Sequence, residues 1–282
     1  MNMKTSLFSW IVVRRFIRAF LEVFGISWLL IEPLALWRPE DLRFGLKGYL
    51  ALAAFSLIVA LYFSRRRTEI SGKLSISDTT ITITKGDLLD QSGNIVIGAT
   101  DTFDTEIGDI IASHSLQGQF QAKHFPNTGE LDALLEKQLS GETPKADKKK
   151  LRGKTLRFPN GTTAVVEKAN SRYFLVAYTK MRNDLRVESD ICMLANALRE
   201  CWGQIRTSGA NQPVHMGVVG SGLARIGLSR SLLIQFIVLS FLDAQKNGSL
   251  TSHLTIYVAE SDIDHVSFSD MGDWLSGLTR LA

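Results

Sequence analysis

The chain has 282 residues, of which 45% are hydrophobic and 21% charged, and this composition excludes an intrinsically disordered protein. Two cysteines, Cys192 and Cys201, are too few for a disulfide scaffold or a four-cysteine zinc site, and they favour reduced, buried thiols in a cytosolic setting. The net charge is +4, but residues 1–68 hold ten basic and four acidic residues against 22 and 24 in the remainder, so the larger part lacks the basic surface that nucleic-acid binding requires.

The N-terminal segment, residues 1–68, contains two apolar stretches. Residues 46–63 read LKGYLALAAFSLIVALYF with Lys47 as the single charge, and a helix of this length spans about 27 Å, close to the hydrocarbon thickness of a bilayer. Residues 16–37 carry Arg18, Glu22 and Glu32, of which the first two are spaced to meet on one helix face. The sequence therefore predicts a transmembrane helical hairpin with spans at about 16–37 and 46–63.

Basic residues flank both outer ends of this predicted hairpin. Lys4, Arg14 and Arg15 precede the first stretch, and Arg65 to Arg67 follow the second. Because such residues stay on the cytoplasmic side, we expect both termini there. An apolar second stretch and an arginine stop disfavour a cleavable signal peptide. The alternative is a pair of helices buried in a soluble domain.

Residues 69–282 alternate between strand and helix patterns, which predicts one α/β domain with a mixed sheet. A polar, basic segment, residues 141–152, is interpreted as a solvated loop, with contact to anionic lipid as the alternative. In chain order we expect strands at 73–78 and 80–84, a strand at 94–99, helices at 104–114 and 130–139, a hairpin at 156–166, a strand at 173–178, a helix at 188–205, a strand at 214–219, a helix at 228–242, a strand at 253–258 and a closing helix at 262–279.

A glycine-rich loop follows the strand predicted at 214–219 and precedes a helix. It reads Gly220-Ser221-Gly222-Leu223-Ala224-Arg225. Glycines let backbone N–H groups turn toward a ligand, and the helix N-terminus adds partial positive charge, so this order is typical of a phosphate site. The spacing is neither GxGxxG nor a P-loop, and an ordinary strand–helix connection is the alternative.

Two further segments follow predicted strands. Thr100-Asp101-Thr102-Phe103-Asp104 offers hydroxyls and carboxylates for a ribose and an aromatic ring for stacking, although Thr and Asp are also usual helix N-caps. Gly86-Asp87-Leu88-Leu89 places a carboxylate at a strand end, where it can accept from an exocyclic amine such as that of adenine or act as a turn residue.

In order and spacing these three features resemble the macro domain, an ADP-ribose-binding α/β/α fold, over about residues 72–282. The resemblance implies that Asp87, with Leu88, contacts adenine and that two loops hold the diphosphate and the distal ribose. The hydrolytic Asn-Ala-Ala-Asn segment of that family is absent here, which favours binding over catalysis, with no metal and no cofactor. The implied loop residues are Thr100, Asp101, Thr102, Phe103, Asp104, Gln117, Gly118, Gln119, Gly220, Ser221, Gly222, Leu223, Ala224 and Arg225.

Joined to the predicted hairpin, this domain resembles the membrane effectors of type II Thoeris anti-phage defence. The resemblance implies a multi-pass protein of the bacterial inner membrane, with the lipid bilayer as a partner. A partner TIR-domain enzyme would consume NAD and supply an ADP-ribose derivative, such as a histidine conjugate. Binding of that signal would drive self-association and membrane disruption. Two alternatives stay open, a membrane-tethered hydrolase of ADP-ribose adducts using Asp101 and Asp104, and a non-catalytic membrane adaptor.

Overall fold

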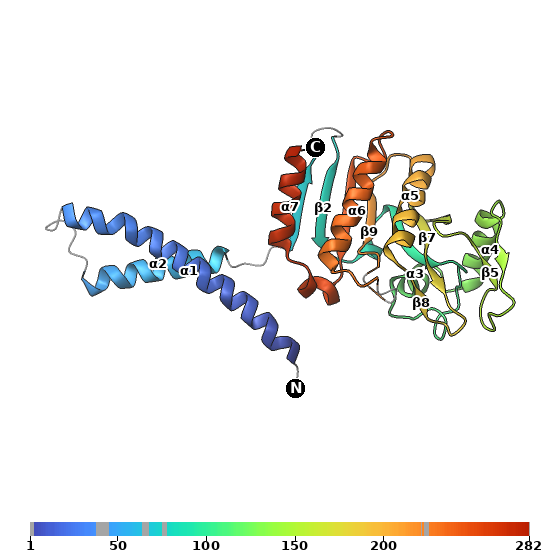
Figure 1. Cartoon of the computed structure of the whole chain (residues 1–282), viewed down its shortest axis with the longest axis horizontal. Helices are drawn as coiled ribbons and strands as arrows, with labels where there is room; N and C mark the ends of the chain where they lie inside the picture. The colour runs from blue at the N-terminus through green and yellow to red at the C-terminus, as the bar shows by residue number, and fades with distance from the viewer. Residues whose placement is uncertain are drawn as a thin grey trace. The chain divides into compact units, whose positions relative to one another are not determined.

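The computed structural model describes residues 3–37, 45–63, 68–74, 78–220, 222 and 226–281. The chain forms two units, Met1–Arg67 and Thr68–Ala282 (Figure 1). Each unit has its own internal contacts and is described by itself.

The first unit is a pair of helices, α1 (Met3–Trp37) and α2 (Leu46–Phe63). The rings of Trp28 and Tyr49 stack between them with centroids 5.4 Å apart. The Nε atom of Arg18 donates to the Glu22 carboxylate at 2.8 Å, which confirms the predicted pair on one helix face.

The predicted transmembrane spans are not supported. Among the described residues, no helix combines the length and the apolar character that crossing a membrane requires. α1 begins at Met3 instead of near residue 16, so its 35 residues include Arg14, Arg15 and Arg18. With Glu22 and Glu32, the sequence range of α1 therefore holds several charged residues, which are costly within a membrane span.

The second unit is built on a mixed sheet whose described strands lie in the order β1-β2-β10-β9-β3-β7-β6, with β8 paired to β7. The central strands β2, β10, β9, β3 and β7 run parallel, whereas β1, β6 and β8 are antiparallel to their neighbours. A separate pair joins β4 to β5. The strands are β1 (Glu69–Lys73), β2 (Thr80–Lys85), β3 (Gly93–Thr100), β4 (Lys145–Ala146), β5 (Leu156–Arg157), β6 (Thr163–Lys168), β7 (Ser171–Met181), β8 (Val187–Glu188), β9 (Val214–Gly217) and β10 (His253–Val258).

Helices cover both faces of this sheet, which confirms the predicted three-layer, macro-domain-like architecture (Figure 1). Apolar side chains of α5, α6 and α7 form one buried layer against the sheet, around Trp202 and Phe241. Those of α3 and α4 form the other, around Phe120 and Tyr173. The helical elements are η1 (Leu88–Asp90), α3 (Leu116–His124), α4 (Thr128–Leu139), α5 (Ile191–Ser208), α6 (Arg230–Gln245), η2 (Glu260–His265) and α7 (Phe268–Leu281).

Three local predictions are wrong. The segment predicted as a helix at 104–114 is irregular, because Gly108 adopts a φ of 120° and Ile107 forms a bridge with Ile111. The first strand covers 69–73, so the strand predicted at 73–78 shares only Lys73 with it, and residues 75–77 of that prediction lie outside the described residues. Residues 156–166 do not form a hairpin, since β5 pairs with β4 while β6 pairs with β7.

The two cysteines have different surroundings. Cys201 is buried in the layer under α5 and α6, and burial raises the pKa of its thiol. Cys192 is exposed at the start of α5, so the expectation of two buried thiols holds for Cys201 alone.

Candidate functional site

The predicted site segments follow strands that run parallel, so they lie at one edge of the sheet. Gly86 and Asp87 follow β2, the segment 101–105 follows β3, and Val218 to Gly220 follow β9. Ligands of open α/β sheets bind outside the carboxyl ends of such strands. A Cβ added to Gly217 would lie 3.5 Å from a Leu116 methyl group and 3.9 Å from one of Leu88. The end of β9 therefore meets η1 and the start of α3 across an apolar contact.

Asp87 is exposed and acts as the N-cap of η1. Its Oδ1 atom accepts from the Leu89 backbone N–H at 2.8 Å. Its carboxylate is thus oriented by the backbone at the strand end. Leu88 is buried beside it, which fits an apolar support under a ligand base.

The segment Thr100 to Asp104 is turned into the protein. Each of its five side chains is at most 8% exposed, and Phe103 adopts a φ of 46° while packing edge-on against Phe158. The aromatic ring predicted to stack on a ligand is therefore part of the core. The loop is buried because a basic segment of the chain packs over it and shields it from solvent.

The basic segment, residues 141–157, supplies the partners of the two carboxylates. Lys150 is fully buried, and its Nζ atom donates to Asp104 at 2.8 Å. The backbone N–H of Lys154 donates to the other Asp104 oxygen at 2.6 Å, and the Thr102 hydroxyl donates to the carboxylate as well. The interpretation of residues 141–152 as a solvated loop is wrong at Lys150, because a buried carboxylate holds it.

Arg157 forms a second link between the same two segments. Its guanidinium donates to Asp101 and to Asp147, both at 2.8 Å, while the other Asp101 oxygen accepts from the Met181 backbone N–H. Burial opposes the charge of Arg157, but its hydrogen bonds to the two carboxylates outweigh burial and raise its pKa. Asp101 and Asp104 therefore orient the loop that carries them.

Sequence reasoning missed this role of Lys150 and Arg157. A signal was present, since the acidic stretch from Asp101 to Asp109 and the basic segment 141–157 have complementary charge. Arg152, which donates to Asp109, extends the same pattern.

The start of α3 carries the next predicted residues. Ser115 caps the helix by accepting from the Gly118 N–H at 3.1 Å. Gln117 is buried and donates to the Asp104 backbone oxygen, whereas Gln119 is exposed and donates to the His114 backbone oxygen. A Cβ on Gly118 would lie 2.4 Å from the Ala112 carbonyl oxygen, so only glycine permits this close approach.

The glycine-rich loop is described in part. Gly220 has a φ of 86°, in the left-handed region that favours glycine. A Cβ added to Gly222 would have no atom of the described residues within 4 Å. The predicted residues Ser221, Leu223, Ala224 and Arg225 lie outside the described residues.

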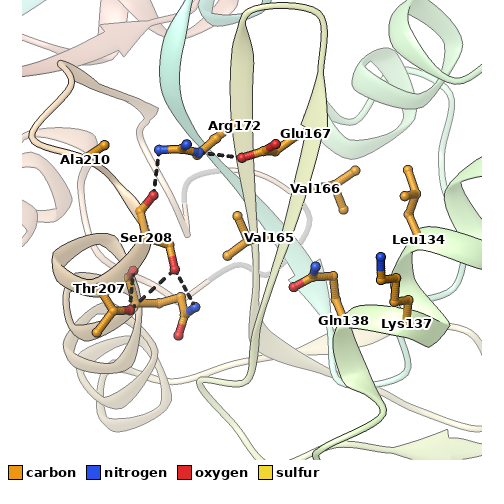
Figure 2. A pocket seen from close by; sticks show the side chains of 11 residues that line it. Leu134, Lys137, Gln138, Val165, Val166, Glu167, Arg172, Thr207, Ser208 and Ala210 are labelled. Carbon is orange, nitrogen blue, oxygen red and sulfur yellow. Dashed lines mark hydrogen bonds and ion pairs between the residues drawn. The ribbon is translucent and has the colours of Figure 1, made fainter.

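A separate cavity of about 610 Å³ lies between α4, β6 and the end of α5. Figure 2 shows its lining, in which Arg172 links Glu167 to the Ser208 backbone oxygen. Arg172 stands at the start of β7, so this cavity is at the opposite edge of the sheet from the predicted loops. None of the predicted site residues lines it.

The described residues contain no cluster of three His, Cys, Asp or Glu side chains with the geometry of a metal site. Among the described residues, the predicted site segments present backbone amides, the exposed Asp87 carboxylate and apolar side chains at the carboxyl edge of the sheet.

This fold is that of a macro domain. Two solved macrodomains of Oceanobacillus iheyensis, both point mutants, superpose with a TM-score of 0.51. One is 12% identical, covering 73% of this chain and 93% of that one; the other is 15% identical, covering 74% and 98%. A third mutant of the same macrodomain, solved with ADPR, has a TM-score of 0.50 at 14% identity, covering 73% and 98%.

Sequence similarity identifies the family within the macro-domain class. Residues 81–259 match the family described as Thoeris protein ThsA, Macro domain, and the chain belongs to that family. The Thoeris protein ThsA of Bacillus amyloliquefaciens is 24% identical over 240 residues, covering 81% of this chain and 79% of that protein.

Proposed function

We propose that this protein is an effector of anti-phage defence whose macro domain binds an ADP-ribose-derived nucleotide and does not hydrolyse it. The observation that carries the proposal is the meeting of η1, the start of α3 and the end of β9, from which the glycine-rich loop leaves, at the carboxyl edge of the parallel strands. Membership of the Thoeris ThsA macro domain family supports it, as does the similar fold of a macrodomain solved with ADPR.

The parts of this site match the parts of the ligand. The exposed Asp87 carboxylate suits the exocyclic amine of adenine, and the buried Leu88 suits its apolar face. Glycine backbone amides and the N-terminus of α3 suit a diphosphate, because both present N–H groups and partial positive charge. The histidine conjugate of ADP-ribose, made by a partner TIR-domain enzyme from NAD, is the proposed physiological form.

Binding is favoured over hydrolysis because the two carboxylates that could act in catalysis are buried and paired. Asp101 and Asp104 are buried and each is paired with a basic side chain, Arg157 and Lys150 respectively. A general acid or base must reach the reacting group by hydrogen bonding. Both carboxylates instead hold the loop in place.

Replacing Asp87 with Asn is expected to weaken ADP-ribose binding about tenfold. The amide keeps an oxygen that caps η1, but it replaces the second carboxylate oxygen with a donor that cannot accept from the adenine amine. The measurement is isothermal titration of the full chain with ADP-ribose. Asp90→Asn, which alters an exposed carboxylate in η1 paired with Lys123, is the matched control and should leave affinity unchanged. Absence of binding by the unaltered protein at millimolar ADP-ribose would contradict the proposal itself.

The first unit is proposed to respond by self-association. Its helices expose large apolar side chains, among them Leu29 on α1 and Ile58 and Leu61 on α2. A ligand shifts such an equilibrium only if it binds one arrangement better than the other. Disruption of the lipid bilayer and location at the bacterial inner membrane with both termini cytoplasmic stay predictions.

Saturating ADP-ribose is expected to increase the sedimentation coefficient of the purified full chain. Sedimentation velocity with and without ligand measures this shift, and Leu61→Gln should reduce it by removing one exposed apolar side chain from the α2 surface. An unchanged sedimentation profile at saturation would rule out ligand-driven assembly.

A further inference from the structure

The cavity of about 610 Å³ lies along the free edge of strand β6. Among the described strands β6 stands last in the sheet, so one of its edges pairs with β7 and the other with no described strand. Val165 packs against the layer that contains α5, whereas Val166 belongs to the layer that contains α4, yet both line the cavity. Figure 2 shows these two side chains between the residues of α5 and those of α4. The cavity therefore surrounds the position that a further strand would take.

The register of β6 shows which backbone groups point to this free edge. The Thr162 backbone oxygen accepts from the Ala177 N–H at 2.9 Å, so the backbone of Thr162 faces β7. Because the direction of backbone bonding alternates along an antiparallel strand, Val165 and Glu167 turn their N–H and C=O groups away from β7. No second strand within the described residues pairs with these groups.

β6 lacks most of the features that keep a sheet edge from pairing. Edges in soluble proteins are usually blocked by proline, by a bulge or by charged side chains along the strand. The strand holds no proline, and its register with β7 runs without a shift from Thr163 to Lys168. Its charged residues, Glu167 and Lys168, stand at one end, and each forms an ion pair. Most of the edge is thus available to another extended segment.

The two walls of this groove differ in chemistry. The α5 wall offers amide and hydroxyl groups, from Gln204, Thr207 and Ser208. On the α4 wall, Leu134 is apolar, and the exposed Lys137 forms no ion pair within the described part of the chain. Glu167 and Arg172 neutralise each other through an ion pair of 2.6 Å. Lys137 therefore gives the groove a net positive charge.

We propose that this groove binds an extended, acidic polypeptide segment, which adds to the sheet as a strand beside β6. Main-chain hydrogen bonds to Val165 and Glu167 supply affinity, and alternate side chains of the segment face the two walls. An acidic side chain on the α4 side meets Lys137, and hydroxyl side chains suit the α5 side. A second copy of this chain fits less well, because its own β6 is flanked by the same two helices. The inference does not rest on the proposed function, since no predicted site residue lines the groove.

A blocked, fluorescein-labelled hexapeptide, Thr-Glu-Thr-Val-Thr-Glu, is the probe for this groove. Titrated with the full chain and followed by fluorescence anisotropy, it should bind saturably and about tenfold more tightly than Thr-Lys-Thr-Val-Thr-Lys. Lys137→Glu should reverse this preference. Lys148→Glu, at an exposed lysine outside the groove, is the matched control and should leave both affinities unchanged. Absence of saturable binding at millimolar acidic peptide, or an unchanged preference in Lys137→Glu, would overturn the inference.

Val165→Pro tests the strand pairing itself. The Val165 N–H points to the free edge, so proline removes a hydrogen bond to the peptide and none to β7. Affinity for the acidic peptide should fall at least about tenfold, while the midpoint of thermal unfolding stays near that of the unaltered protein. Val165→Ala, which keeps the N–H group, should lose much less affinity.

N-methylation of the peptide gives the same test without altering the protein. Methyl groups on alternate amides should abolish binding in one frame, where these amides face β6, and spare it in the other. Equal effects of the two patterns would overturn strand addition. Sedimentation velocity without nucleotide tests the second copy as occupant. A dimer that Val165→Pro abolishes, in a protein that does not bind the acidic peptide, would assign the edge to self-pairing and refute the proposed segment.

Discussion

Lys150→Met is expected to lower the free energy of unfolding of the second unit by about 3–5 kcal/mol. The Lys150 ammonium and the Asp104 carboxylate are both inaccessible to solvent, with side-chain exposures of 0% and 1%. Methionine fills a similar volume but leaves the carboxylate buried without its counter-charge. The loss of solvation that folding imposes on Asp104 is then no longer offset.

Denaturant unfolding of the full chain measures this loss. Lys149→Met, at an exposed neighbouring position, is the matched control and should change stability by less than about 0.5 kcal/mol. The double variant Asp104→Asn with Lys150→Met should be more stable than Lys150→Met alone, because it removes both charges. Equal free energies of unfolding for Lys150→Met and Lys149→Met would contradict the expected cost of leaving Asp104 without its partner.

Gly222→Glu is expected to weaken ADP-ribose binding by more than about a hundredfold. If the diphosphate lies at this loop, as proposed, the added carboxylate brings a like charge close to it, and each pair of like charges about 5 Å apart costs about 3 kcal/mol at an effective dielectric constant of about 20. The fold should tolerate the change, because no atom of the described residues lies within 4 Å of a Cβ at this position and its φ is outside the left-handed region.

Gly222→Gln is the control for this variant, since it adds the same bulk without the charge. Titration with ADP-ribose should show a much smaller loss for Gln than for Glu. Phage protection in cells separates sensing from the adaptor alternative, which requires no nucleotide. Protection that persists in Gly222→Glu while binding is lost would favour the adaptor.

Several elements were predictable because their patterns are local. The continuous apolar run at residues 94–99 predicted β3, and the helical spacing of Leu194, Leu198 and Trp202 predicted α5. Both elements differ from the predicted bounds by only a few residues. The segment 104–114 failed for the opposite reason, since its apolar residues suit a helix but Gly108 turns the chain out of one.

In the candidate site as well, features set by nearby residues were predictable, and a contact between distant segments was not. Asp87 and Gly118 have roles that depend on neighbours a few residues away in the sequence. Asp87 caps η1, and Gly118 lets its helix approach the Ala112 carbonyl oxygen closely. Phe103 was predicted to stack on a ligand and is instead buried against Phe158, a residue far along the chain. No periodicity in either segment indicates that contact.

The sequence by itself determined that an α/β domain follows two helices and that the predicted site segments follow strands, because hydrophobic period and glycine placement act over short distances along the chain. Only the tertiary structure decided which charges are available at those loops. Asp104 meets Lys150 and Asp101 meets Arg157 across 46 and 56 residues. Such partners are chosen by the folding of distant segments onto one another, so a carboxylate that the sequence predicts as a ligand contact is a buried structural anchor in the fold.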